Sequence, residues 1–206
     1  MSQYIEINPY GVDKNRIKAV IDALNQGAVI AYPSDSGFAL GCKMGLKKPL
    51  DRIKRIRGLD DKHNFTLICR DLSEISHFAI VDNISYRILK KHTPGGYTFI
   101  LPATSHVPSL MLNKNKKTVG IRLSDHPVPG LLSEQLGQPL LSTTLILPDH
   151  PAPVVYADEI PKEIGDVIDI VLESDYCGYE QTTVIDLTEV PPRLVREGSG
   201  DVTPFI

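Results

Sequence analysis

Short apolar runs alternate with amphipathic segments through the first two thirds of the chain, and this alternation is the strongest constraint on the fold. Segment 13–26 carries apolar residues at helical spacing, and the apolar run 28–32 follows it between Gly27 and Pro33. We expect a helix and then a buried strand there. The pattern repeats downstream until strands follow one another directly near the C-terminus. This order predicts an α/β fold with helices packed around a twisted, mixed sheet.

The other predicted elements follow from the same periodicities and from turn residues. The acidic, proline-bearing stretch 148–166 is expected to be an irregular loop with a short helix. At about 150 residues per domain, a length of 206 residues predicts one large domain, or one domain with an appendage, and we expect a single domain over 1–206. Helices are predicted over 46–57, 71–78, 82–92, 105–112 and 127–136, and strands over 65–69, 97–103, 118–123, 139–147, 167–173, 182–187 and 193–197.

The composition excludes several classes of protein. Hydrophobic residues make up 42% and charged residues 23% of the chain, which is typical of a soluble globular protein and not of a disordered one. No apolar run approaches the roughly 18 residues that span a membrane, and the N-terminus lacks a secretion signal pattern. The widely spaced Cys42, Cys69 and Cys177 form neither a disulfide framework nor a CxxC zinc motif. We therefore expect a cytoplasmic protein with reduced thiols and no membrane partner.

The net charge of −3 conceals a strong asymmetry along the chain. Segment 43–62 holds eight basic and three acidic residues, and Lys114, Lys116 and Lys117 form a second basic cluster. Segment 149–175 holds eight acidic residues and one basic residue. If the fold brings the two basic segments to one face, that face would attract phosphate groups. The alternative is ordinary solvated surface charge.

Several common catalytic signatures are absent from the sequence. There is no GxxxxGKS/T or GxGxxG phosphate loop, no GxSxG elbow and no HExxH zinc motif, and the six histidines show no close pairing. Arginines and hydroxyl side chains instead gather at the ends of predicted strands and helices. Arginine offers a permanently charged fork to a carboxylate or phosphate, and hydroxyls can approach phosphate oxygens or magnesium. The residues concerned are Ser34, Ser36, Arg55, Arg57, Arg122, Ser142, Thr143, Thr144, Thr182, Thr183 and Arg196, with Asp35 between the first two.

Each of these residues also has an ordinary structural explanation. Threonines such as Thr143 and Thr183 are good strand formers, and Arg122 could be half of a surface ion pair. Taken together, the set favours a pocket for an anionic substrate.

Six sequence blocks, in unbroken order, resemble those of a known family. The blocks are YPSDSGFALGC (32–42), KRIRGLDDKHNFTLIC (54–69), TPGGYTFILPA (93–103), VGIRLSDHPVPGLLSEQLGQPLLSTT (119–144), QTTVIDL (181–187) and LVREGSG (194–200). They resemble, in the same order, the YPT-x-T-x-x-GLG-C, K-x-R-P…PL, PGP-x-T, VGVR-x-P-x-HP…STSAN, P-S-T-V-x-D and x-x-R-x-G segments of the YrdC family, the threonylcarbamoyl-AMP synthases. The resemblance covers about residues 14–200, and the STT and REG-x-GDV forms are those of the YciO subgroup.

This resemblance implies a YrdC/RibB-like fold, with helices around a twisted mixed sheet and a concave, basic cavity. It implies ATP, L-threonine and bicarbonate as substrates, with magnesium arriving with ATP. Threonine and bicarbonate would form a carbamate that attacks the α-phosphate of ATP, releasing pyrophosphate and leaving threonylcarbamoyl-AMP for later transfer to tRNA. Double-stranded RNA or tRNA and tRNA-modification proteins are the further partners implied. Such a nucleotidyl transfer depends mainly on positioning and charge neutralisation.

The resemblance also implies roles for individual residues. It assigns no catalytic side chain and no metal ligand from the protein. The residues on the threonine side are Ser34, Arg122 and Thr182. The residues on the ATP and phosphate side are Arg55, Arg57, Thr118, Ser142, Thr144 and Arg196.

Two departures from the family pattern bear on activity. Ile146 stands where the family has the asparagine of STSAN, and Arg55 stands where it has lysine. Isoleucine offers no polar group to phosphate or magnesium, and arginine replaces a point charge with a planar fork. We therefore expect a synthase-type nucleotidyltransferase of low or altered activity, and the alternative is a non-catalytic RNA- or nucleotide-binding module that kept the cavity. Ile146 either faces the nucleotide or belongs to the core, if the strand 139–147 shifts by a residue.

Overall fold

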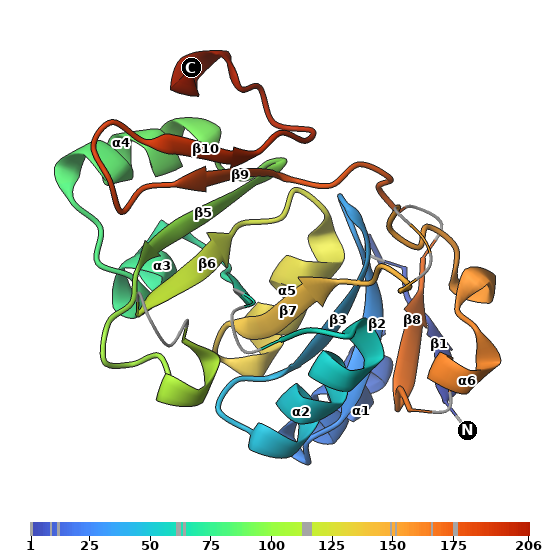
Figure 1. The fold of residues 1–206 in the computed structure, drawn as a ribbon. Helices are drawn as coiled ribbons and strands as arrows, with labels where there is room; N and C mark the ends of the chain where they lie inside the picture. Colours follow the sequence, from blue (N-terminus) through green and yellow to red (C-terminus); the bar gives the residue numbers. More distant parts are fainter. Residues whose placement is uncertain are drawn as a thin grey trace.

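The sheet of this protein holds ten strands among the residues that the computed structural model describes (Figure 1). Those residues are 2–8, 10–11, 13–60, 63, 65–112, 117–148, 150, 152–165, 167–174 and 177–206. The strands are β1 (Gln3–Glu6), β2 (Val29–Ser34), β3 (Gly37–Lys43), β4 (Thr66–Ile68), β5 (Tyr97–Pro102), β6 (Thr118–Arg122), β7 (Leu140–Thr144), β8 (Ile170–Glu173), β9 (Thr183–Asp186) and β10 (Arg193–Arg196). The helices are α1 (Lys14–Asn25), α2 (Lys47–Arg57), α3 (Leu72–Phe78), α4 (Asn83–His92), α5 (Pro127–Leu136) and α6 (Lys162–Gly165), with single 3-10 turns η1 (Ser109–Met111), η2 (Ala157–Glu159) and η3 (Thr203–Phe205).

Parallel and antiparallel pairings mix along the sheet. Its order is β1-β8-β2-β3-β7-β4-β6-β5-β9-β10. Strand β8 pairs in parallel with β1 and β2, β4 with β6, and β5 with β9. The remaining neighbours are antiparallel. The twisted mixed sheet flanked by helices, predicted from the alternation of strands and helices, is thereby confirmed (Figure 1).

One face of the sheet packs on helices α2, α3 and α4. Ile53 of α2, Ile75 of α3 and Leu89 of α4 belong to the same buried apolar cluster as Leu40 of β3 and Phe99 of β5. Full burial of such a side chain contributes about 1.5–3 kcal/mol. This cluster is the main hydrophobic core, and it extends beneath most strands of the sheet.

The opposite face divides into an apolar half and a polar half. Helices α1 and α5 pack against β2, β3, β4 and β7, where Val20 and Leu24 of α1 and Val128 of α5 cluster with Ile30. Side chains alternate between the two faces along a strand. Over β5, β6, β7 and β9, the positions that face away from the main core are mostly polar or glycine. These positions include Thr98, Ile100, Thr118, Gly120, Arg122, Ser142, Thr144 and Val184.

Most predicted elements lie within a few residues of the observed ones, and the differences have local causes. Helix α5 has the predicted bounds, and Asp13 caps α1 by accepting from the amides of Asn15 and Arg16. Strands β1 and β3 were not predicted, and the helix predicted over 105–112 is reduced to η1. The sequence of β3, GFALGCK, holds two glycines, which disfavour strands as a rule. None of the helices in the described ranges is both long and apolar enough to cross a membrane.

The unpredicted strand β3 forms a tight hairpin with β2. Ser34 pairs with Gly37 across the turn, and Gly37 has a φ of +98°, in the region that favours glycine. A Cβ atom at Gly37 would also lie 2.4 Å from Cβ of Pro153. The turn therefore requires glycine, and it holds Ser34, Asp35 and Ser36 at the end of β2.

Gly41 tests how closely β3 packs against its neighbours. A Cβ atom at Gly41 would lie 2.8 Å from Cε1 of Tyr32 and 3.0 Å from Cδ2 of Leu140. We expect Gly41→Ala to lower the free energy of unfolding by about 1–3 kcal/mol, because overpacking displaces buried side chains. Urea unfolding followed by circular dichroism measures the change.

Gly130→Ala on α5 is the matched control for that variant. No atom of the described residues lies within 4 Å of a Cβ atom at Gly130, which sits inside a helix. The change should leave the free energy of unfolding unaltered or raise it by up to about 1 kcal/mol. Equal effects at Gly41 and Gly130 would contradict tight packing around Gly41.

Candidate functional site

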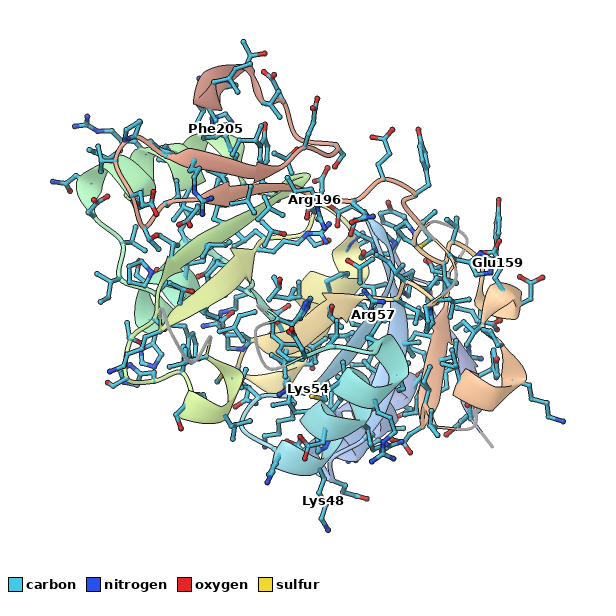
Figure 2. All side chains as sticks on the ribbon, in the orientation of Figure 1. Lys48, Lys54, Arg57, Glu159, Arg196 and Phe205 are labelled. Carbon is cyan, nitrogen blue, oxygen red and sulfur yellow. The ribbon has the colours of Figure 1, made fainter. Side chains whose placement is uncertain are left out.

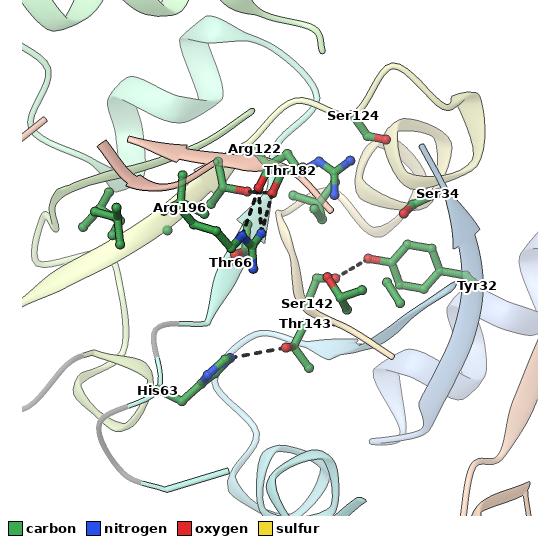
Figure 3. Close-up of a pocket in the computed structure, with 18 residues that line it drawn as sticks. Tyr32, Ser34, His63, Thr66, Arg122, Ser124, Ser142, Thr143, Thr182 and Arg196 are labelled. Carbon is green, nitrogen blue, oxygen red and sulfur yellow. Dashed lines mark hydrogen bonds between the residues drawn. The ribbon is translucent and has the colours of Figure 1, made fainter. Parts of the chain in front are cut away.

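A cavity of about 450 Å³ opens on the polar half of the sheet (Figure 3). It extends from β2 to β10, across the strands that lie between them in the sheet. Among the described lining residues there are two guanidinium groups, one imidazole and no carboxylate. The hydroxyl-bearing lining residues are Tyr32, Ser34, Thr66, Thr98, Ser124, Ser142, Thr143, Thr144 and Thr182. Such a lining suits a polar, anionic ligand.

Arg122, at the end of β6, is held by the mostly buried carboxylate of Asp35. Its Nη2 lies 2.5 Å from Oδ1 of Asp35, and its Nη1 donates a hydrogen bond of 2.7 Å to Oγ of Ser36. The hydroxyl of Ser124 donates to the same carboxylate. Burial by itself would raise the pKa of Asp35, but the charge of Arg122 and these hydrogen bonds hold that pKa below its ordinary value. Asp35 and Arg122 therefore form an ionised pair with little net charge.

Arg196, from β10, is the second guanidinium group of the cavity. Its Nε and Nη2 donate to the carbonyl of Thr182 at 3.1 and 2.8 Å, and Oγ1 of Thr182 lies 2.9 Å from Oγ1 of Thr98 (Figure 3). Burial, and then the charge of Arg122, lower the pKa of Arg196, but the guanidinium stays charged because arginine is not deprotonated in proteins. No carboxylate among the described residues forms an ion pair with it. Arg196 thus supplies the cavity with a positive charge that an anion can balance.

Hydroxyl pairs build the side of the cavity next to β2. The hydroxyl oxygens of Tyr32 and Ser142 lie 2.5 Å apart, and burial raises the pKa of Tyr32, so the phenol stays protonated. Ser34 donates to the carbonyl of Gly37 at 2.6 Å and accepts from the amide of Ser36 at 3.2 Å. Because the Ser34 proton is already donated, its oxygen can only accept from a ligand.

His63 reaches the cavity from the segment that follows α2. Its Nε2 lies 3.3 Å from Oγ1 of Thr143, and its ring packs edge-on against Phe65 at 5.2 Å between centroids. Burial and the charge of Arg57 lower the pKa of His63. The imidazole is therefore neutral at neutral pH.

Six of the nine site residues named by the family resemblance line this cavity, and three do not. Arg55 is exposed on α2. Arg57, at the end of α2, is half-buried, and its guanidinium donates to the carbonyl of Ile146. Thr118 is buried at the start of β6, where no described group makes a hydrogen bond to its Oγ1. The six that line the cavity are Ser34, Arg122, Ser142, Thr144, Thr182 and Arg196.

Ile146 occupies neither of the two positions expected for it. Strand β7 ends at Thr144, and Leu145 is the residue that enters the main core. Ile146 is half-buried, forms an isolated bridge with Pro153, and is not among the side chains that line the cavity. Its main-chain carbonyl, however, holds Arg57. The segment after β7 is thus attached to the end of α2 through a main-chain atom.

The two basic segments are described only in part, because Lys62, Lys114 and Lys116 lie outside the described residues. On α2, Lys48 is exposed and points away from the sheet (Figure 2). Arg52 instead pairs with Asp169 at 2.8 Å. One residue of the acidic segment therefore neutralises part of the basic one.

The described residues contain no group of three or more side chains suited to hold a metal ion. The cavity offers neutral hydroxyls, whereas magnesium prefers carboxylate and phosphate oxygens. Magnesium therefore fits this cavity only as an ion carried by the phosphates of a substrate. The thiols are no better suited, because burial raises the pKa of Cys42 to about 12 and that of Cys177 to about 11.

Comparison with known proteins identifies the family of this chain. A family model described as telomere recombination, which joins the Sua5, YciO and YrdC proteins, matches residues 22–198. The chain belongs to this family. The resemblance to the YrdC family and its YciO subgroup, predicted from the six sequence blocks, is thereby confirmed.

Relatives and solved structures agree on the family and the fold. The chain is 46% identical to YciO of Escherichia coli over 206 residues, all of both chains, and the crystal structure of that protein matches with a TM-score of 0.95. It is 30% identical over 158 residues to the threonylcarbamoyl-AMP synthase of Nitrosococcus oceani, covering 76% of this chain and 84% of that one. The crystal structure of P. abyssi Sua5 complexed with L-threonine, 20% identical, shares the fold with a TM-score of 0.82 over 96% of this chain and 57% of that one.

Five polar or titratable residues of the cavity were not predicted from the sequence, namely Tyr32, His63, Thr66, Thr98 and Ser124. A signal for two of them exists, because Thr66 and Thr98 each precede an apolar residue that faces the main core on the same strand. Strict alternation places these threonines on the opposite face. His63 and Ser124 lie outside strands, where no periodicity in the sequence indicates which way a side chain points.

The ion pair of Asp35 and Arg122 predicts a specific response to substitution. Only 11% of the Asp35 side chain and 7% of the Arg122 side chain are exposed. We expect Asp35→Asn to lower the free energy of unfolding by about 3–5 kcal/mol at neutral pH, because a buried guanidinium loses its counter-charge. Urea unfolding measures this loss, and Asp22→Asn, at an exposed position of α1, is the matched control.

The same pair predicts how stability depends on pH. The pKa of Asp35 is lower in the folded than in the unfolded protein, so its contribution is complete above the unfolded value of about 3.9 and is lost as the pH falls through the folded value. Asp35→Asn should therefore lose less stability than the parent between about pH 5 and about pH 2. Parallel acid-unfolding curves for the parent and Asp35→Asn would show that the pair does not contribute.

Proposed function

We propose that the protein binds ATP and L-threonine in this cavity and, with bicarbonate, forms threonylcarbamoyl-AMP and pyrophosphate. The observation that carries the proposal is the cavity lining, which combines many neutral hydroxyls with a paired and an unpaired guanidinium group. The 30% identity to a threonylcarbamoyl-AMP synthase supports this reaction over other uses of an anion-binding cavity.

The proposed reaction has two steps. The amine of threonine and bicarbonate condense to a carbamate and release water. A carbamate oxygen then attacks the α-phosphate of ATP, and the bond from that phosphorus to the bridging oxygen breaks as pyrophosphate leaves. No covalent bond to the protein forms, so the protein contributes binding, orientation and neutralisation of charge. Magnesium enters as part of the ATP substrate.

The geometry suggests how the residues divide between the two substrates. Arg196, whose charge no described carboxylate balances, is proposed to meet the triphosphate, with Ser142 and Thr144 as hydroxyl donors. Arg122 is proposed to meet the threonine carboxylate, since Asp35 and Ser36 hold its guanidinium in one orientation. Ser34 would accept from the amine or hydroxyl of threonine.

Low or altered activity is part of this proposal. Ile146 carries no polar side chain at the position where the family has asparagine, so that contact to phosphate or magnesium is absent. Arg57 is proposed to remain on the phosphate side, since its charge acts on His63 at the cavity wall. The carbonyl of Ile146 that holds Arg57 would position it there.

A pyrophosphate-release assay tests the proposed reaction. We expect release to require ATP, bicarbonate and an amino acid together, with L-threonine the most effective. Arg196→Ala should weaken ATP binding about tenfold to a hundredfold, because a charge-assisted hydrogen bond contributes about 1.5–3 kcal/mol. Arg196→Lys should recover only part of this affinity, since lysine lacks the planar fork.

Arg87→Ala, which removes an exposed charge from α4, is the control for the loss of one cation. It should leave ATP affinity unchanged. ATP binding without amino-acid-dependent release of pyrophosphate would support the non-catalytic nucleotide-binding module instead. If ATP does not bind at all, the proposed function is wrong.

We further propose that helix α2 binds double-stranded RNA or tRNA through phosphate contacts. Lys47, Lys48 and Arg55 are exposed on this helix, and Lys48 and Arg55 lie seven residues apart, on one side of it. Helix α2 carries no aromatic side chain on which a base could stack. Such a surface would recognise charge and duplex shape without reading sequence.

The salt dependence of RNA affinity tests this surface. Affinity for duplex RNA should fall steeply as salt rises, because each phosphate contact releases counterions. Replacing Lys47, Lys48 and Arg55 together by alanine should reduce the slope of log affinity against log salt by about 2–3. The matched control replaces Arg87, Lys90 and Lys91, three exposed cations of α4. A similar reduction in both triple variants would exclude α2 as the RNA surface.

A further inference from the structure

The titratable side chains among the described lining residues are those of Arg122, Arg196, Tyr32 and His63. No role has been given above to His63. Its imidazole faces Thr143 of β7, with Nε2 3.3 Å from the threonine Oγ1 (Figure 3). On its other side the ring packs edge-on, at 81°, against Phe65. The ring is therefore held in one orientation at the wall of the cavity, next to the hydroxyls of β7.

The charges around His63 are mainly positive among the described residues. Arg57 and Lys54 act on it from α2, and Arg196 acts on it from β10. Asp60, in the segment after α2, is the one acid among the described residues that opposes them. Burial and then Arg57 lower the pKa of His63, Asp60 raises it in part, and Arg196 and Lys54 lower it further. Thr143 and Phe65, which contact the ring from β7 and β4, carry no charge.

This environment is unfavourable to a protonated imidazole only while the cavity holds no anion. A bound triphosphate would bring several negative charges among the same cations and reverse the balance at His63. A protonated imidazole then has two N–H donors, whereas the neutral ring has one donor and one acceptor. The neutral ring can satisfy the Thr143 hydroxyl, and the protonated ring can also donate to a phosphate oxygen.

We propose that His63 contacts a phosphate group of the bound nucleotide, taking up a proton from solvent as the nucleotide enters and returning it as the nucleotide leaves. This inference rests on the proposed function, since it concerns the nucleotide of that same cavity. His63 is a binding residue here and takes no part in breaking the phosphate bond. Polyphosphate affinity should consequently depend on pH around neutrality, where histidine is the side chain that most readily changes charge.

Calorimetric titration in two buffers tests the proposal. Magnesium-saturated ATP and, separately, inorganic triphosphate are titrated into the protein in Tris and in PIPES, whose heats of ionisation differ. Proton uptake makes the measured binding enthalpy depend on the buffer. Between about pH 6 and about pH 8 the affinity of the parent should fall as the pH rises, by at most about tenfold per pH unit for a single proton.

His63→Gln and His106→Gln are the matched variants. Glutamine keeps an amide donor but cannot titrate, so His63→Gln should lose most of the buffer dependence and flatten the pH profile. His106 is exposed and outside the cavity lining, so His106→Gln should behave as the parent. Any proton uptake by the ligand itself is the same in all three proteins and cancels in the comparison.

Proton magnetic resonance of the imidazole C–H signals gives a second readout that does not depend on a variant folding. The signal of His63 should titrate below the ordinary histidine range in the free protein, and at higher pH in the triphosphate complex. ATP binding with an unchanged His63 titration would overturn this inference while leaving the proposed function intact. Binding of inorganic triphosphate but not of ATP would contradict the proposed function and still test His63. If neither ligand binds, both proposals are wrong.

Discussion

The alternation of side chains between two unlike faces of one sheet is the constraint on which this structure depends. Phe99, Ile121 and Leu141 face the main core, while their neighbours Thr98, Arg122 and Ser142 line the cavity. A slip of one residue in any of these strands would bury the polar side chains in the core and expose the apolar ones. The apolar core and the polar cavity therefore specify the same register, and neither can change without the other.

The same sheet explains how two guanidinium groups are kept close together. Burial of a charged group is unfavourable unless it is paired or hydrogen-bonded. Arg122 meets this requirement through Asp35, which the turn between β2 and β3 holds in place. Arg196 meets it through the carbonyl and hydroxyl of Thr182. Because the second solution uses neutral groups, the cavity keeps a positive charge for an incoming anion.

Family membership and cavity chemistry support the proposed function from different directions. The relatives identify a fold on which threonylcarbamoyl-AMP synthases are built, and the cavity of this chain has the hydroxyl and guanidinium groups that the proposed reaction would use. The hydrogen bond from Arg57 to the carbonyl of Ile146 bears on the departure from the family pattern at Ile146. A main-chain contact survives a change of side chain, so the departure at Ile146 need not move α2.

Local sequence signals determined the elements, because helix caps, apolar spacing and turn glycines act within a few residues. The bounds of α5, the Asp13 cap of α1 and, to within one residue, the bounds of β6 all follow from such signals. The six family blocks added the fold and six of the residues that line the cavity. The sequence pattern does not show which way a side chain points outside a strand. His63 and Ser124 lie outside strands and were therefore not predicted.

Tertiary structure alone decided which groups meet. Asp35 and Arg122 are 87 positions apart and form one ion pair because β2 and β6 run into the same cavity. Arg57 does not line the cavity itself, and its guanidinium instead donates to the carbonyl of Ile146, 89 positions away in the sequence. Strand β3, whose two glycines disfavour a strand, forms because it pairs with β2 on one side and β7 on the other. The missing side chain at Gly41 leaves the space that Tyr32 and Leu140 occupy. These outcomes depend on partners that are distant in sequence, whereas periodicity and capping report only on neighbours.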